Sequence, residues 1–249
     1  LYSGEIAAAN ATAKTAMENS LSAALANLQA DNTTLAAYTN LVNSGVITNA
    51  EIGPFTLPTI DQVLAISSNI TDHVTACNTA DKLYQEGETG YDTDAAAIAD
   101  INTKHTQLAA IVSDCNAALT AAWDAIQDTR EADMADIAFF TDNTDTNVTT
   151  LATAAVTLYT NGAAAYTALE AAITAYNEAA NTEKMAKMQV VVEKAQALAN
   201  CVNAYNDPST GYTAKMNNAK DLAAYSDISN KVLNFITTTV EPVQTAVTN

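Results

Sequence analysis

The feature that most constrains this chain is a pair of apolar seams within residues 63–126. In each half of this stretch one residue in every three or four falls on a common helix face, which is the spacing of a buried helical row. The first seam consists of Val63, Ile66, Ile70, His73, Cys77, Ala80 and Tyr84. The second consists of Asp94, Ile98, Ile101, His105, Leu108, Val112, Cys115, Leu119, Ala122 and Ile126. The spacing predicts two long helices.

These two helices are expected to form an antiparallel hairpin. Residues 86–91 contain two glycines among polar residues, so they are the predicted turn. In the resulting register Ile70 lies opposite Leu108, and His73 lies opposite His105. The only two histidines of the chain would then face each other.

Composition favours an all-α fold. The 249 residues include only 7 glycines and 4 prolines, and aromatic residues make up 6%. Alanine and threonine dominate instead, which suits closely packed helices better than a sandwich or barrel. We therefore predict an elongated antiparallel helical bundle with long, coiled-coil-like hairpins.

Helix boundaries follow from the same pattern and from the turn residues. Helices are expected at residues 4–30, 33–43, 149–159, 163–205 and 212–239, besides the hairpin. Gly45 should end the first pair, since glycine is the common residue after a helix end. The polar runs 141–147 and 206–211 are predicted turns. Residues 46–58 form the one clear loop, because two prolines there exclude a regular helix.

Two short repeats suggest an internal duplication. The tripeptide Tyr-Thr-Asn begins at residues 38 and 159, and Thr-Gly-Tyr begins at residues 89 and 210, so both are displaced by 121 positions. The chain is therefore predicted to contain two similar helical units, residues 1–121 with the proline loop and residues 122–249, packed as one continuous bundle.

The sharpest candidate for a metal site is the set His73, Cys77 and His105. Imidazole and thiolate are ligands that zinc and copper prefer, and the hairpin register would bring the three together. No fourth ligand is evident. The alternative is that these side chains simply fill the seam.

Three cysteines leave two interpretations open. Cys77 and Cys201 would form a disulfide between the duplicated units, leaving Cys115 free, or all three would be small buried thiols. Glycosylation sequons occur at four asparagines, about the number that chance would give in a sequence rich in Asn, Ser and Thr. They are Asn10, Asn32, Asn69 and Asn147.

Carboxylates and amides cluster at residues 91–94 and 142–147, where weak calcium binding is one interpretation. Neither run has the central glycine and terminal glutamate of an EF-hand loop. The alternative is that they are solvated turns and helix caps.

The net charge of −18 argues against nucleic acid and anionic membrane surfaces as partners, because both require basic patches. No apolar run is long enough to span a membrane. The motifs of hydrolase elbows, phosphate-binding loops, dinucleotide folds and zinc proteases are absent from the sequence. An enzyme is therefore not expected.

The predicted function is structural: a self-assembling subunit of an extracellular filament, coat or granule matrix, secreted or displayed at the cell surface. The low charged fraction of 15% means that Thr, Asn, Ser and Ala must cover the surface and offer it to neighbouring copies. The alternative is a helical binding module for a small apolar ligand or a host partner. In that case Pro54, Phe55, Leu57 and Pro58 of the loop would be the contact or lid.

Overall fold

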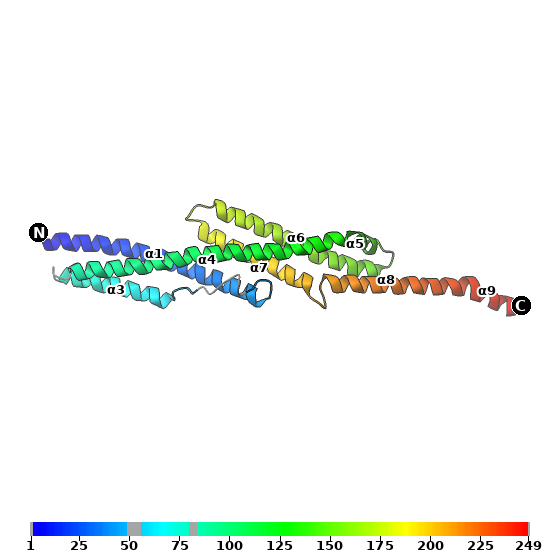
Figure 1. Cartoon of the computed structure of the whole chain (residues 1–249). Helices are drawn as coiled ribbons and strands as arrows, with labels where there is room; N and C mark the ends of the chain where they lie inside the picture. The colour runs from blue at the N-terminus through cyan, green and yellow to red at the C-terminus, as the bar shows by residue number, and fades with distance from the viewer. Residues whose placement is uncertain (1, 49–55, 80–83, 249) are drawn as a thin grey trace. The chain divides into compact units, whose positions relative to one another are not determined.

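The computed structural model describes residues 2–48, 56–79 and 84–248 (Figure 1). Within these ranges the chain is helical apart from short connections and contains no strand, which confirms the predicted all-α class. The helices are α1 (Tyr2–Asn43), α3 (Ile60–Thr79), α4 (Tyr84–Ala132), α5 (Met134–Thr141), α6 (Thr146–Glu178), α7 (Lys184–Asn206), α8 (Tyr212–Phe235) and α9 (Glu241–Thr248), with a π-helical segment η2 (Ile236–Val240) before the last.

Local sequence explains the ends of the first helices. Gly45 follows α1 with a φ of 81°, a conformation that suits glycine, and its N–H donates to the Val42 carbonyl at 2.9 Å. At the start of α3, Thr59 and Gln62 form a capping box. The Thr59 N–H donates to the Gln62 side chain at 2.8 Å, and the Gln62 N–H donates to the Thr59 hydroxyl at 3.3 Å.

The predicted turn at residues 86–91 is wrong, because α4 already begins at Tyr84 and includes that segment. Gly90 serves a different purpose there. A Cβ atom at Gly90 would come within 3.0 Å of the His73 ring, so the missing side chain lets α3 approach α4 closely. Glycine at this position reflects helix packing and not chain reversal.

The earlier start of α4 shifts the hairpin register by about four helical turns from the predicted one. His73 lies beside Tyr91 and Asp94 instead of His105, and Ile66 shares a groove with Ala97. The seam positions of α4 themselves are confirmed. Those that are buried are Asp94, Ile98, Ile101, Leu108, Val112, Cys115, Leu119 and Ile126.

The chain divides into two compact units. Unit 1 comprises residues 1–118 and 172–193, and unit 2 comprises residues 119–171 and 194–249. This division differs from the predicted halves, because residues 172–193 belong to unit 1. The Thr-Gly-Tyr repeat also falls in unlike places, since Gly90 lies within α4 and Gly211 precedes α8. The duplication and the coiled-coil character stay predictions.

Unit 1 is built around α1, α3 and the first part of α4. Its core contains Leu21, Ala24, Leu28, Val63, Ile70, Ile98 and Ile101, with Met17, Leu25, Leu57, Ile66 and Tyr91 packed against it. Two polar contacts join α1 to α4: Asp31 with His105, and Tyr38 with Asn116. The contact later in α1 is made with the residue later in α4, so the two helices run parallel.

Unit 2 has an aromatic core. The Trp123 ring stacks on Tyr159 with centroids 5.3 Å apart, and the Arg130 guanidinium lies 4.0 Å above the same tyrosine ring. Tyr205 and Tyr212 stack at 4.7 Å. Burial raises the pKa of Tyr205 to about 12 and raises that of Tyr212 as well, so both rings stay neutral at physiological pH.

Two predicted helix boundaries in the second half of the chain are wrong. The expected helix over residues 163–205 is interrupted at residues 179–183, which contain no glycine or proline to signal a break. The expected start at residue 163 is absent, because α6 runs through Gly162 without interruption. A Cβ atom at Gly162 would collide with the Trp123 ring, so this glycine, like Gly90, permits close packing.

Candidate functional site

The main candidate site is a cavity of about 50 Å³ in unit 1, where four helices meet. Its polar lining consists of Asp31, Thr34, His105, Tyr176 and Lys184, and its apolar lining includes Leu108, Met185 and Met188. A space of this size holds a few non-hydrogen atoms, which is far less than the 300–1,000 Å³ or so of a typical pocket for an organic ligand.

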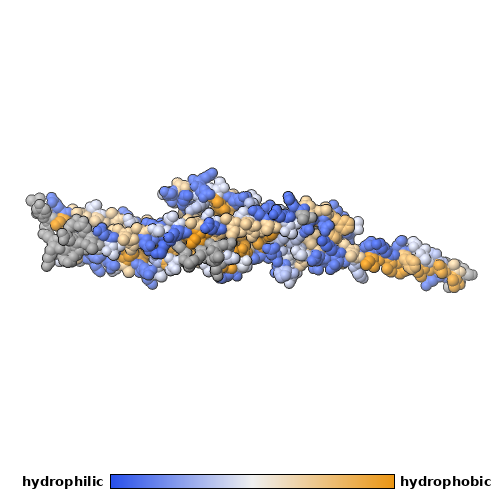
Figure 2. All heavy atoms as spheres, viewed as in Figure 1, coloured by the Kyte–Doolittle hydropathy of each residue, from blue (hydrophilic) through white to orange (hydrophobic). Residues whose placement is uncertain are grey.

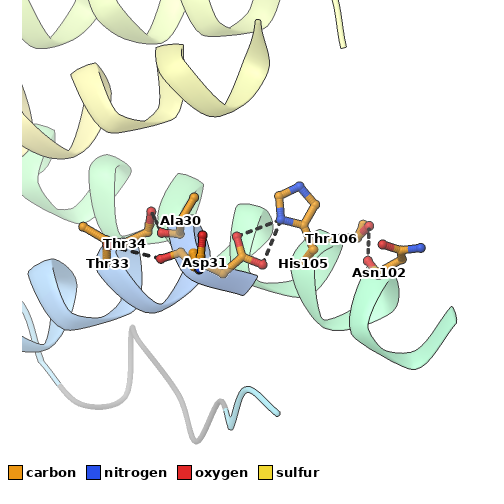
Figure 3. A network of polar contacts seen from close by, with 8 residues as sticks. Ala30, Asp31, Thr33, Thr34, Asn102, His105 and Thr106 are labelled. Atoms are coloured by element: carbon orange, nitrogen blue, oxygen red, sulfur yellow. Dashed lines mark hydrogen bonds and ion pairs between the residues drawn. The ribbon is translucent and has the colours of Figure 1, made fainter. Parts of the chain in front are cut away.

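The strongest polar contact at the cavity joins Asp31 and His105. The imidazole Nδ1 lies 2.7 Å from one carboxylate oxygen of Asp31 and 2.9 Å from the other. Figure 3 shows this nitrogen turned toward the carboxylate and the other ring nitrogen on the far side of the ring. The hydrogen bond to Asp31 raises the pKa of His105, although partial burial opposes the shift.

Sequence reasoning missed Asp31 as a candidate site residue. Its position along the helix nevertheless indicated burial, because it follows the spacing of the apolar residues. From residue 21 onward the buried face of α1 consists of Leu21, Ala24, Leu28, Asp31, Thr34, Tyr38 and Leu41. An aspartate on an otherwise apolar helix face requires a partner when buried, and Asp31 is only 5% exposed. The partner is one of the two histidines.

Tyr176 of α6 and Lys184 of α7 also line the cavity. The Lys184 ammonium lies 4.6 Å from the centroid of the Tyr176 ring, a cation–π contact. Burial raises the pKa of Tyr176, and the negative charge of Asp31 adds to the shift. The phenol therefore stays protonated.

The polar groups that line the cavity lie around His105. The Thr34 hydroxyl, which also lines the cavity, donates to the Ala30 carbonyl at 3.0 Å. It is thus held along its own helix and is not paired with the imidazole as a nucleophile would be. What the cavity offers a ligand is the free edge of His105, two thioethers and a fixed carboxylate behind the ring.

The structure does not bring together the predicted metal set His73, Cys77 and His105. His73 is paired with Asp94, with 3.7 Å between Nδ1 and the carboxylate, whereas His105 is paired with Asp31. Asp94 and His105 are eleven residues apart along α4, or about 16 Å at 1.5 Å per residue. The side chain of Cys77 lies outside the described part of the structure.

The buried carboxylate of Asp94 is the second polar feature of the seam. Asp94 is 3% exposed, and burial raises its pKa while the nearby His73 partly offsets the rise. It lies well inside α4 and therefore does not cap that helix. Neither this carboxylate nor the run at residues 142–147 forms a cation site together with other described acidic residues. Asp145 instead starts α6, with its carboxylate accepting the Asn147 N–H at 2.8 Å.

The remaining predicted positions lie in varied settings. Cys115 is buried and Cys201 is half-buried. Asn10 is 2% exposed, and a glycan on its side chain is incompatible with this packing. The other three sequon asparagines, Asn32, Asn69 and Asn147, are exposed. In the loop, Leu57 packs on the unit 1 core and Pro58 is half-buried, whereas Pro54 and Phe55 lie outside the described residues.

A second candidate feature is an exposed apolar face along α8, η2 and α9 in unit 2 (Figure 2). We call it the C-terminal apolar face. It consists of Tyr225, Ile228, Val232, Ile236, Val240, Val243 and Val247. Exposed fractions along it include 71% at Tyr225, 61% at Ile228 and 81% at Val247. The average step is close to the 3.6 residues of one helical turn, so the face follows the helix axis.

This face points away from the side of α8 that packs within unit 2. Lys220 of α8 pairs with Asp136 of α5 at 3.1 Å, and Ala223 and Asp227 line a groove with Phe140. At about 100° per residue these positions lie on the other side of the helix from the C-terminal apolar face. Residues 222–249 carry only two acidic residues and one lysine, in a chain of net charge −18.

Among the described residues no helix is both long enough and apolar enough to cross a membrane. Comparison with known proteins finds no matching family model, no matching curated protein and no matching solved structure.

Proposed function

We propose that this protein is a structural subunit that assembles with copies of itself, and that the C-terminal apolar face is the assembly contact. The observation that supports the proposal is the exposure of this face over more than six helical turns. Exposed apolar patches of more than a few hundred Å² on soluble proteins usually mark interaction sites. A second copy offers the same face, so the contact can be self-complementary.

The charge distribution supports a partner of the same kind. Two chains of net charge −18 repel each other, and the repulsion is smallest where the fewest charges lie. Within the C-terminal segment the Lys231 ammonium lies 2.6 Å from the Asp227 carboxylate, so most of this small charge is paired. Salt should therefore strengthen the assembly by screening the remaining repulsion.

The energetics fit a reversible contact. Full burial of an aliphatic or aromatic side chain contributes about 1.5–3 kcal/mol, so burying the exposed half of each contributes about 1 kcal/mol. A symmetric pair would bury about six such side chains from each copy, or about 12 kcal/mol in total, against an association cost of about 4–15 kcal/mol. We expect dissociation constants in the micromolar range or weaker for a single contact.

Sedimentation velocity over a concentration series tests this proposal. The wild-type chain should shift to larger species between about 1 and 200 µM. Val232→Asp should abolish the shift, because each copy would place a carboxylate in the apolar contact. Asn234→Asp is the matched control, since it adds the same charge on the same helix but on the opposite side. A wild-type monomer throughout, or equal effects of the two substitutions, would refute the proposal.

The extracellular or surface location belongs to the same proposal and is supported by composition alone. Its test is the location of the protein in cells of its source, by fractionation and by protease protection of intact cells. Complete protection until the cells are lysed would contradict it.

One observation favours the alternative of a binding module. A groove of about 440 Å³ in unit 1 is lined by Leu57 and Pro58 of the loop together with Val63, Ile66 and Ile101. Its volume and its apolar wall suit a small apolar ligand. Native mass spectrometry of protein from its source should then show a retained mass, which Ile101→Asp would remove. A clean spectrum of the bare chain would count against this function.

A further inference from the structure

We propose that the cavity of unit 1 binds a soft monovalent metal ion, Cu(I) or Ag(I), through the thioethers of Met185 and Met188 and the Nε2 atom of His105. This site does not depend on the proposed assembly. It also differs from the predicted set of His73, Cys77 and His105, because only His105 is shared and the sulfur ligands are thioethers from another helix.

The two methionines line the same cavity as the histidine. Met185 and Met188 are three residues apart near the start of α7, so they share one helix face. Both line the same cavity as His105, which is contributed by α4. A cavity of about 50 Å³ is too small for most organic ligands but has room for a metal ion.

The imidazole is already oriented for coordination. Asp31 holds its Nδ1 atom at 2.7 and 2.9 Å, which leaves Nε2 on the opposite edge of the ring (Figure 3). A carboxylate behind a histidine is the usual support of a metal-bound imidazole, since it fixes the ring and increases its donor strength. The Asp31 side chain, only 8% exposed, is itself shielded from solvent.

The donor set selects a soft ion. Thioethers are neutral, soft ligands that favour Cu(I), whereas zinc prefers thiolate, imidazole and carboxylate ligands. Within residues 2–48, 56–79 and 84–248, no group of three or more His, Cys, Asp and Glu side chains is placed to hold a metal. The negative charge of Asp31 and the net charge of −18 both favour a cation. The positive charge of Lys184 opposes it and is directed over the Tyr176 ring.

The test uses the full chain labelled with ¹³C at the methionine methyl groups and titrated with silver nitrate in chloride-free buffer. Ag(I) avoids the oxidation chemistry of copper. The titration continues past three equivalents, because the three cysteine thiols also bind Ag(I). The methyl signals of Met185 and Met188 should shift. Those of Met17, Met134 and Met216 should stay in place and are the internal control.

Substitution separates coordination from a nonspecific effect. His105→Gln should raise the Ag(I) concentration needed to shift the two methyl signals by at least tenfold, and Asp31→Asn should raise it by about 10–100-fold. His73→Gln is the matched control and should leave the titration unchanged. The proposal is overturned if the two signals do not shift in the wild type, or if they shift equally in the His105→Gln variant.

Discussion

Replacement of Gly162 by alanine should destabilise unit 2, although glycine is normally the weaker residue within a helix. Gly162 lies inside α6 and is buried against Trp123. In an unobstructed helix interior, glycine to alanine would contribute about 1 kcal/mol of stability. Here the added Cβ would come within 3.0 Å of ring atoms Cζ3 and Cη2 of Trp123. Contact at about 3.5 Å would require the ring to move by about 1.4 Å.

That movement is costly because Trp123 is 0% exposed and stacks on Tyr159. Overpacking of a well-packed core costs about 1–3 kcal/mol, and complete displacement of the ring would approach the 3–5 kcal/mol or so of removing a large buried side chain. After the gain in helix propensity of about 1 kcal/mol is subtracted, the net loss should be up to about 4 kcal/mol, and at least about 2 kcal/mol if the ring is fully displaced. For a chain of this length Tm should fall by up to about 12 °C.

The assay is chemical and thermal unfolding followed by circular dichroism and by tryptophan fluorescence. Trp123 is the only tryptophan, so its emission reports directly on the affected ring and should shift to longer wavelength in Gly162→Ala. Gly4→Ala is the matched control, because an added Cβ there meets nothing within 4 Å. It should leave Tm unchanged or slightly higher.

A second substitution tests the proposed collision itself. Trp123→Phe in the Gly162→Ala background shortens the ring and should recover part of the lost stability, so the two changes should be non-additive. Strictly additive effects, or a Gly162→Ala variant with raised Tm and unchanged emission, would refute the packing argument.

Three further predictions concern single polar contacts. Tyr38→Phe should cost about 1–2 kcal/mol in urea unfolding, because the buried hydroxyl donates to Asn116 at 2.6 Å; no loss would contradict that bond. Hydrogen bonds from Thr210 lower the pKa of Asp207, so its carboxylate stabilises the fold when it is charged. The Tm of the wild type should therefore exceed that of Asp207→Ala at pH 7, and the difference should vanish as the pH falls below about 4. A difference in Tm that persists at pH 2 would contradict this. Burial raises the pKa of Asp94, so its carboxylate destabilises the fold as the pH rises through that pKa. Asp94→Asn should therefore raise Tm by about 2–6 °C at pH 7 but not at pH 3. A lower Tm of this variant at pH 7 would show that the pair of Asp94 and His73 is net stabilising.

The candidate site was only partly accessible from the sequence. His105 was singled out for its position in an apolar seam, and in the structure it lines the unit 1 cavity. Its partner Asp31 lies 74 residues away in another helix, and the two methionines lie in a third. Periodicity identifies which face of a helix is buried, but it carries no information about which helix covers that face.

The sequence by itself determined the all-α class, the buried phase of α4, the end of α1 at Gly45 and the turn before α8, because these depend on local spacing and on residues with restricted backbones. Only the tertiary structure decided the register and the partners. Gly90 and Gly162 could have marked a turn or a helix start, and they instead admit the rings of His73 and Trp123 from neighbouring helices. A glycine in a turn and a glycine beneath a ring are identical in sequence. What distinguishes them is the space that another segment fills, and that is fixed only when the helices pack.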